Sequence, residues 1–230
     1  MPIAIVTGAS QGFGLALTTA LTAQNWTVVA DARDDRRLDA AVGHDRQVRA
    51  VPGDVADPAH RAELVETART LGGLDLLVHN ASELGPSPMP ALVSYPLLVL
   101  GRVFDVNVVA PLALTQLALP LLRRSPAPAV VTLSSDAAVE PYPGWGGYGA
   151  SKAALDHLAA VLAAEHPELM VYAFDPGDMR TDMHQRAFPG EDITDRAAPD
   201  EVVPALLRLL SARPGSGRYR AADLLRSEAA

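Results

Sequence analysis

Tyr148 and Lys152 are the two residues of this chain whose types and spacing most directly suggest chemistry. They stand four apart in a stretch with a helical pattern, so both side chains leave one face of a helix, one turn apart. A phenol with a pKa of about 10 is a poor base at neutral pH, but a nearby ammonium stabilises the phenolate. Lys152 is the single lysine beside 18 arginines, and lysine shifts its pKa more readily than arginine does. The pair predicts a tyrosine prepared for proton transfer; a solvated lysine on a helix face is the alternative.

A second candidate site is the glycine-rich turn that contains Gly8, Gly12 and Gly14. Gly8 allows a tight turn, Gly12 lets the backbone approach a pyrophosphate, and Gly14 permits close contact between helix and strand. The helix that follows offers free N–H groups and a positive partial charge to phosphate. The turn therefore predicts a dinucleotide site, although the same glycines also suit a plain strand-to-helix turn.

The composition excludes several classes of protein. Of 230 residues, 49% are hydrophobic and 20% are charged, which predicts one folded domain over residues 1–230 and excludes a disordered chain. The net charge of −8 makes nucleic acid and anionic membranes poor partners. The chain has no cysteine, and its six histidines lack the spacing of metal ligands, so no disulfide and no metal site are predicted.

No targeting segment is evident in the sequence. The opening residues, MPIAIVTGAS, have neither a basic region nor a long apolar region. We see no run of about 18 apolar residues, and the nearest run, 110–122, is interrupted by Thr115 and Gln116. We therefore expect a cytoplasmic protein.

The elements that must position these residues follow an alternating order. Short, apolar, β-branched runs predict strands at residues 3–7, 27–31, 48–52, 74–79, 130–134 and 170–174. Longer amphipathic stretches predict helices at residues 12–24, 58–71, 97–122, 148–165 and 199–210. This order predicts an α/β fold, a doubly wound parallel sheet with helices on both faces. Ligands of such sheets bind beyond the carboxyl ends of the strands.

Three irregular segments, 83–96, 136–147 and 176–198, interrupt this order. All three follow predicted strands and emerge at the same edge of the sheet, so together they can form the wall of one pocket. The apolar residues that could line it are Leu84, Tyr142, Trp145, Met179, Met183 and Phe188. Each of these residues could equally be core beneath a loop. Three acidic residues, Glu83, Asp136 and Glu140, favour a polar or cationic group or are simply solvated.

The motifs and their order resemble the short-chain dehydrogenase/reductase family. TGASQGFG at residues 7–14 is similar to that family's TGxxxGxG, and YGASK at residues 148–152 is similar to its Tyr-x-x-x-Lys signature. The other matching positions are Asp54 and Val55, HNAS at residues 79–82, Asn107, Ser135, and PGDMRT at residues 176–181. The likeness covers roughly residues 3–210, and it implies a Rossmann-like sheet of about seven strands.

The resemblance implies a role for each catalytic position. Tyr148 is the acid or base, and Lys152 binds the ribose and lowers the pKa of the tyrosine. Ser135 orients the substrate oxygen, with capping of a strand-end turn as its alternative. Asn107 relays protons through an irregularity in its helix, with a purely structural buried amide as the alternative. The implied cofactor contacts are Gly8, Ser10, Gln11, Gly12, Phe13, Gly14, Arg33, Asp54, Val55, Asn80, Ala81, Tyr148, Lys152, Pro176, Gly177, Met179 and Thr181.

The sequence departs from the family pattern at two places. Ser82 stands where the family usually has glycine, which alters the turn beneath the nicotinamide. GSGRYR at residues 215–220 lacks the usual Asp-Gly-Gly ending, which puts the last strand and one subunit contact in doubt.

The residues after the second predicted strand favour NADP over NAD. The acid that selects NAD would fall on Ala32, and Arg33 takes the position that favours a 2′-phosphate. Asp31 is one position early and is expected to turn away. Gln11, where NADP-dependent members often have a basic residue, argues in the other direction.

The resemblance implies interconversion of a small-molecule carbonyl and a secondary alcohol by an NADP- or NAD-dependent enzyme. It also implies a homodimer or homotetramer packed through the helices at 97–122 and 148–165. Two alternatives stay open: a catalytically silent dinucleotide-binding regulator, and an enzyme of elimination or isomerisation chemistry. The sequence does not identify the substrate.

Overall fold

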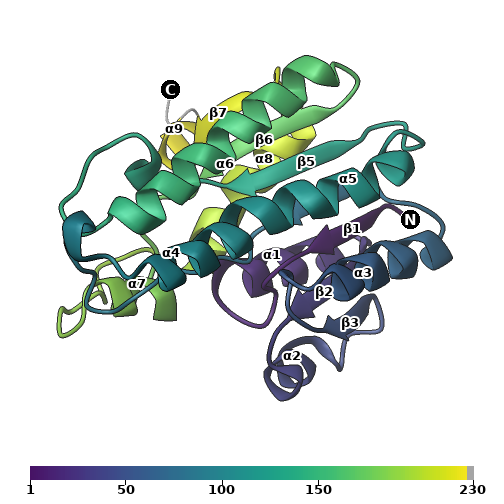
Figure 1. Cartoon of the computed structure of the whole chain (residues 1–230). Helices are drawn as coiled ribbons and strands as arrows, with labels where there is room; N and C mark the ends of the chain where they lie inside the picture. The colour runs from purple at the N-terminus through teal and green to yellow at the C-terminus, as the bar shows by residue number, and fades with distance from the viewer. Residues whose placement is uncertain (227–230) are drawn as a thin grey trace.

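The computed structural model describes residues 1–226, and these contain a seven-stranded parallel sheet (Figure 1). The strands are β1 (Ile3–Val6), β2 (Thr27–Ala32), β3 (Val48–Pro52), β4 (Leu76–His79), β5 (Ala129–Leu133), β6 (Met170–Asp175) and β7 (Gly217–Arg220). They lie in the order β3-β2-β1-β4-β5-β6-β7, and every neighbouring pair is parallel. The order reverses where β1 meets β4, which is the point at which such sheets bind ligands. The predicted fold class is confirmed.

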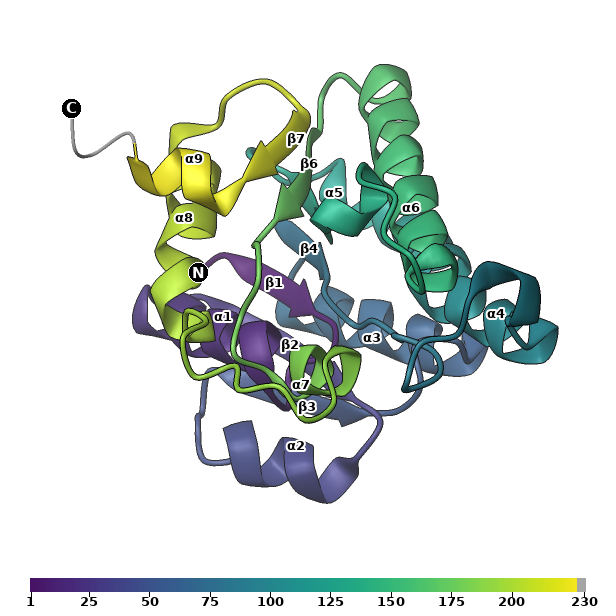
Figure 2. The same ribbon diagram turned by 90° about the vertical axis from the view of Figure 1, so that its left-hand side faces the viewer.

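The helices cover both faces of this sheet. They are α1 (Gly12–Ala23), α2 (Asp35–Val42), α3 (Pro58–Leu71), α4 (Leu97–Phe104), α5 (Ala110–Leu122), α6 (Gly146–Glu165), α7 (Asp182–Ala187), α8 (Pro199–Ala212) and α9 (Ala221–Arg226). In β1, Ala4 and Val6 pack into the core under α1 and α8, whereas Ile3 and Ile5 pack under α3 and α5. The alternation follows because successive side chains of a strand point to opposite faces. Figure 2 shows the two helical layers on either side of the sheet.

Two helix starts agree with the turn chemistry in the sequence. The Asp57 carboxylate accepts a hydrogen bond from the N–H of Ala59 at 2.9 Å, with Pro58 in the first turn of α3. At α8, the Glu201 carboxylate accepts from the N–H of Ala198 at 3.1 Å, next to Pro199. In both helices the acid satisfies an N–H group that the helix leaves free, and proline removes none that the helix needs.

The predicted helix at residues 97–122 is interrupted by a π-helical turn, η2 (Asp105–Val109), between α4 and α5. The continuous stretch Leu97–Leu122 is long and apolar enough to cross a membrane: an 18-residue part of it has a mean hydropathy of 1.8, with 33% of that part buried. From the sequence we expected no such stretch, because we considered only apolar runs without a polar interruption. Leu114, Ala118 and Leu121 pack into the core under the sheet, as core helices of this composition do.

The doubt about the last strand is wrong. β7 forms, and its residues pair with β6 in parallel register, Tyr172 opposite Gly217 and Asp175 opposite Arg220. A serine just before β7 secures its start, because the Ser216 hydroxyl accepts a hydrogen bond from the N–H of Val171 at 3.0 Å. The edge strand of the sheet therefore forms from residues whose sequence differs from the family ending.

The three irregular segments lie at the carboxyl edge of the sheet, and they contain two short 3₁₀ turns, η1 (Leu92–Ser94) and η3 (Asp136–Ala138). The third also contains α7, which was not expected. Its N-terminus is capped by the Thr181 hydroxyl, which accepts from the N–H of His184 at 3.2 Å. Threonine at this position satisfies a free N–H of a short helix.

Candidate active site

The glycine-rich turn packs directly on the strand end that follows β4. Gly8 has a φ of +68°, and a Cβ there would lie 2.9 Å from the Cα of Ala81. The Asn80 amide donates to the carbonyls of Thr7 at 2.8 Å and Gly8 at 3.0 Å. A Cβ at Gly14 would lie 2.4 Å from that amide nitrogen. Gly8 and Gly14 are thus required by packing.

Gly12 serves another purpose, since its surroundings would accept a side chain without a clash. Its φ is +55°, and a Cβ there would meet only Thr181, at 3.5 Å. Gln11, which precedes α1, makes no side-chain cap, so the first N–H groups of the helix have no capping side chain. A glycine beside uncapped N–H groups leaves room and donors for a phosphate. This part of the chain fits a dinucleotide pyrophosphate.

These features border one cleft of about 600 Å³. Most residues named from the sequence as cofactor contacts line it: Gly8, Ser10, Gln11, Gly12, Phe13, Arg33, Asp54, Val55, Asn80, Ala81, Tyr148, Lys152, Pro176, Met179 and Thr181. Two of the named cofactor contacts, Gly14 and Gly177, are not among its lining residues, and neither are the catalytic candidates Asn107 and Ser135. The cleft opens at the carboxyl edge, next to the point where β1 meets β4.

Tyr148 and Lys152 lie on one side of α6, facing this cleft. The Lys152 ammonium lies 5.5 Å from the centre of the Tyr148 ring. It donates a hydrogen bond to the Leu133 carbonyl at 2.7 Å, and only 2% of the residue is exposed. The strand end β5 therefore holds the lysine beside the tyrosine.

The protein alone shifts the tyrosine pKa in the direction opposite to the one expected. Burial raises the pKa of Tyr148 above its ordinary value, and the charges of Asp136 and Asp175 raise it further, whereas hydrogen bonds to Ser82 and Ser135 lower it. Burial also lowers the pKa of Lys152 to about 8. Both shifts have one cause, because a dry site disfavours phenolate and ammonium alike.

Ser135 caps a turn, as one alternative from the sequence expects, while its contact with the substrate oxygen stays a prediction. Its hydroxyl donates to Asp136 at 3.0 Å and accepts from the N–H of Ala137 at 3.2 Å, which caps η3. It also lowers the pKa of Tyr148, which places it beside the tyrosine hydroxyl. Ser134 turns elsewhere, since its hydroxyl donates to Asp156 at 2.7 Å.

Asn107 lies in the π-helical turn η2, and its side chain is fully engaged. Its amide nitrogen donates to the carbonyl of Glu83 and to the Ser151 hydroxyl, each at 2.9 Å. Its oxygen accepts from the N–H of Glu83 at 2.7 Å and from the Ser82 hydroxyl at 3.2 Å. The buried amide thus holds the segment after β4 against α6; its relay role stays a prediction.

The far end of the cleft carries arginines paired with acids. Arg33, whose side chain is 62% exposed, contacts Glu83 at 3.5 Å. Asp31 borders the cleft, but its carboxylate accepts from the N–H of Gly8 at 2.8 Å and pairs with His60 at 3.0 Å. Asp31 is 1% exposed and already accepts from two partners, whereas the Arg33 guanidinium is open to solvent, so a cation is the more accessible group beside the end of β2.

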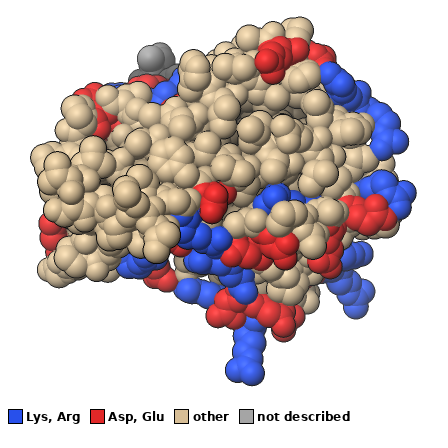
Figure 3. All heavy atoms as spheres, viewed as in Figure 1, with Lys and Arg blue, Asp and Glu red and all other residues tan. Residues whose placement is uncertain are grey.

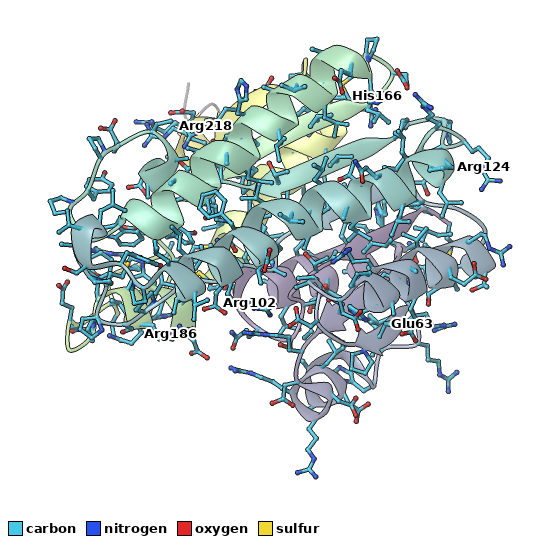
Figure 4. All side chains as sticks on the ribbon, viewed as in Figure 1. Glu63, Arg102, Arg124, His166, Arg186 and Arg218 are labelled. Atoms are coloured by element: carbon cyan, nitrogen blue, oxygen red, sulfur yellow. The ribbon has the colours of Figure 1, made fainter. Side chains whose placement is uncertain are left out.

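The sequence reasoning missed two arginines that line this end. Arg37 pairs with Asp182 of α7 at 2.8 Å, and Arg102 of α4 pairs with Asp54. Figure 4 labels Arg102 at the edge of α4. A signal for Arg37 was present, because it follows Arg33 by four residues at the start of a helix; nothing in the sequence pointed to Arg102.

An apolar cluster surrounds Tyr148 on the side of the irregular segments. Leu84, Ala137, Tyr148 and Ala187 form its buried part, with Met89, Trp145, Met183 and Phe188 against them. Of the expected lining residues, Met179 and Met183 line the cleft and Tyr142 is exposed. The others, Leu84, Trp145 and Phe188, pack in this cluster and are not among the residues that line the cleft. Among residues 1–226, no group of three or more metal-ligating side chains is found.

Comparison with known proteins gives a consistent result. The family model described as short chain dehydrogenase matches residues 2–192. Benzil reductase ((S)-benzoin forming) of Saccharomyces cerevisiae is 35% identical over 216 residues, covering 89% of this chain and 80% of that protein. Sepiapterin reductase of Mus musculus is 34% identical over 201 residues, covering 80% of this chain and 77% of that protein.

Solved structures of other proteins have a fold similar to that of this chain over almost its whole length. A short chain dehydrogenase from Shigella flexneri, complexed with NADP, has a TM-score of 0.90 and 30% identity, covering 96% of this chain and 97% of that one. One from Escherichia coli, complexed with NADPH, has a TM-score of 0.89 and 31% identity, covering 96% of each chain.

Proposed function

The chain belongs to the short chain dehydrogenase family, and on that premise we propose that this NAD(P)-dependent oxidoreductase interconverts a carbonyl and a secondary alcohol. We assign the reaction to one cofactor-binding and catalytic domain over residues 1–230. The observation that carries the proposal is the placement of Tyr148 and Lys152 in the wall of the cleft that begins at the glycine-rich turn.

Tyr148 is the proton donor in reduction and the acceptor in oxidation. Its raised pKa keeps it protonated at neutral pH, which suits donation to a carbonyl oxygen. The nicotinamide, when bound, supplies or accepts the hydride. The Ser135 hydroxyl, beside the tyrosine, turns from Asp136 to donate to the same substrate oxygen and stabilises the charge that develops on it.

Lys152 adds positive charge beside the tyrosine. With a pKa lowered to about 8, it is protonated in most molecules at pH 7 and favours a phenolate when the proton leaves. Its bond to Leu133 fixes the ammonium at the end of β5. A buried lysine is costly, so its presence in the wall of the cleft supports a role in the reaction.

NADP(H) is the preferred cofactor in this proposal. Arg33 and Arg37 line the far end of the cleft, and their guanidinium groups match a 2′-phosphate. Asp31, the nearest acid on β2, is already engaged. The complexes of two similar proteins with NADP and NADPH support the same choice.

The substrate is a small molecule whose carbonyl lies next to an apolar or aromatic group. The cluster of Trp145, Met183 and Phe188 beside Tyr148 favours such a group by apolar contact. Two relatives are reductases named for benzil and sepiapterin, which supports a ring-bearing carbonyl compound.

We also propose a cytoplasmic homodimer that packs through α5 and α6. Leu112, Leu117 and Val161 are exposed on these helices, and Val109 is exposed at the end of η2. Figure 3 shows little charge on this face. An exposed apolar face of this kind indicates a partner surface, and the helices at residues 97–122 and 148–165 are the ones that the family resemblance implies.

A substrate screen tests the function. The protein is incubated with NADPH or NADH and a panel of aryl and alkyl ketones and diketones, and cofactor oxidation is followed by absorbance. We expect turnover of aryl ketones or diketones, faster with NADPH. Tight NADPH binding without turnover of any member would instead support the silent regulator.

A further inference from the structure

Arg218 of β7 makes a set of contacts near the site, and none of the roles proposed above involves this residue. Its Nη2 donates to the main-chain carbonyl of Ser135 at 2.9 Å and to the carboxylate of Asp175 at 2.8 Å. Its Nε donates to the carboxylate of Asp156 at 3.2 Å. Figure 4 labels Arg218 beside α6, near β7. One guanidinium thus joins the ends of β5 and β6 to α6.

The carboxylates of Asp156 and Asp175 are costly to bury, and the charge of Arg218 offsets that cost. The side chain of Asp175 is 4% exposed and that of Asp156 is 15% exposed. Burial raises the pKa of Asp156, whereas the Ser134 hydrogen bond and the charge of Arg218 lower it. A guanidinium can satisfy several acceptors at once because its five N–H groups lie in a fixed plane.

These contacts converge on Ser134 and Ser135, the two residues that follow β5. The Ser134 hydroxyl donates to the same Asp156 oxygen that Arg218 contacts. The carbonyl of Ser135 accepts a hydrogen bond from Arg218. Asp156 follows Lys152 by one helical turn on α6, and its charge opposes the lowering of the lysine pKa. The position of Ser135 relative to α6 is therefore set through Arg218.

We propose that Arg218 is a positioning residue for the reaction: it holds the main chain of Ser135 so that the serine hydroxyl meets the substrate oxygen beside Tyr148. The inference rests on the proposed function, since it assigns to Ser135 the contact with that oxygen. The proposal also gives a reason for the arginine in the unusual segment at residues 215–220. Arg218 is far from Ser135 in sequence but contacts it in the fold.

The charges around Tyr148 add a second consequence. Asp136 of η3 and Asp175 of β6 raise its pKa, Lys152 lies beside it on α6, and two serine hydroxyls lower it. Arg218 neutralises Asp175. Without the arginine, the uncompensated carboxylate raises the pKa of Tyr148 further, because a nearby like charge disfavours the phenolate.

Three variants test the proposal. Arg218→Met removes the charge and all three contacts, and Arg218→Lys keeps the charge but lacks the planar group that spans them. Arg220→Met is the matched control, since it makes the same charge change on the same strand at an exposed residue. The measurements are kcat and KM with the best ketone of the screen, NADPH affinity by fluorescence, and the pH profile of alcohol oxidation.

We expect kcat of Arg218→Met to fall by about ten- to a hundredfold, the cost of a displaced catalytic group. NADPH affinity changes little, and the alkaline rise of alcohol oxidation moves to higher pH. The kcat of Arg218→Lys falls by a smaller factor. This variant provides the test if Arg218→Met does not fold. Equal kcat in Arg218→Lys, Arg220→Met and wild type would overturn the proposal.

Crystal structures of wild type and the Arg218 variant that folds give a readout independent of turnover. We expect the Ser135 main chain to move by about 1 Å, a shift of the size that impairs catalysis. An unmoved Ser135 would also overturn the proposal. An inactive wild type would instead refute the proposed function, while the structures still decide the role of Arg218.

Discussion

The ammonium of Lys152 lies 5.5 Å from the centre of the Tyr148 ring, and its hydrogen bond goes to the Leu133 carbonyl. The lysine acts on the tyrosine through space, at a distance where one charge contributes a few kcal/mol at most in a partly dry site. Burial of the phenol works against it. Burial outweighs the charge of the lysine, so Tyr148 stays protonated in the protein alone.

Tyr148→Phe tests the proton-transfer role. We expect kcat to fall by about 10²- to 10⁴-fold, the usual contribution of a positioned acid or base. NADPH affinity should stay within a few-fold, because the ring and its packing against Trp145 remain. Steady-state kinetics and fluorescence titration give the two values.

Tyr219→Phe is the control for that experiment. This substitution is equally conservative. Tyr219 lies on β7, and its hydroxyl donates to the carbonyl of Gly215 at 2.6 Å. Similar kcat values for Tyr148→Phe and Tyr219→Phe would contradict the assignment of Tyr148.

Lys152→Met tests the cost of the buried lysine. The folded pKa of about 8 lies below the ordinary 10.5, so burial of the ammonium destabilises the wild type below pH 8 and ceases to do so as pH rises to 10.5. The free energy of unfolding of wild type should therefore gain roughly 3 kcal/mol relative to Lys152→Met over that window. Urea denaturation at both ends of the window measures it.

The same variant should lose most activity, since the charge beside Tyr148 is gone. At pH 7 its stability should equal or exceed that of wild type, apart from about 1 kcal/mol for the hydrogen bond lost at Leu133. A difference between the two proteins that does not vary with pH would show that the lysine keeps its ordinary pKa.

Much of the fold was predictable because its elements are locally encoded. The strand at residues 48–52 and the helix at residues 58–71 were predicted with the bounds that β3 and α3 have. Asp57 and Pro58 explain the second, since they define a helix start on their own. Helix α7 was missed because it has six residues and no long apolar stripe.

The site was less predictable where contacts come from distant segments. Spacing indicates that Tyr148 and Lys152 share a helix face, and the order of motifs identifies the glycine-rich turn. No spacing rule brings Arg218 to Ser135, 83 residues away. Burial around Tyr148 also depends on three separate segments, so the direction of its pKa shift could not be read from Lys152 alone.

Ser82→Ala tests the residue that departs from the family's glycine. The Ser82 hydroxyl donates to Asn107 at 3.2 Å and lowers the pKa of Tyr148. Its removal raises that pKa, so the rise of kcat/KM for alcohol oxidation should move to higher pH, while the Asp136 and Asp175 charges continue to act. The exposed Ser94 provides Ser94→Ala as control; coincident profiles for the two variants would refute the prediction.

Arg33→Ala tests the choice of cofactor. Arg33 lines the cleft and is exposed enough to leave Glu83 for a phosphate. Loss of a charge-assisted contact worth about 1.5 to 3 kcal/mol should lower kcat/KM for NADPH by roughly ten- to a hundredfold and leave NADH nearly unchanged. Arg36→Ala is the matched control, because Arg36 is exposed and does not line the cleft. Equal losses with both cofactors, or none with NADPH, would mean that selectivity lies elsewhere.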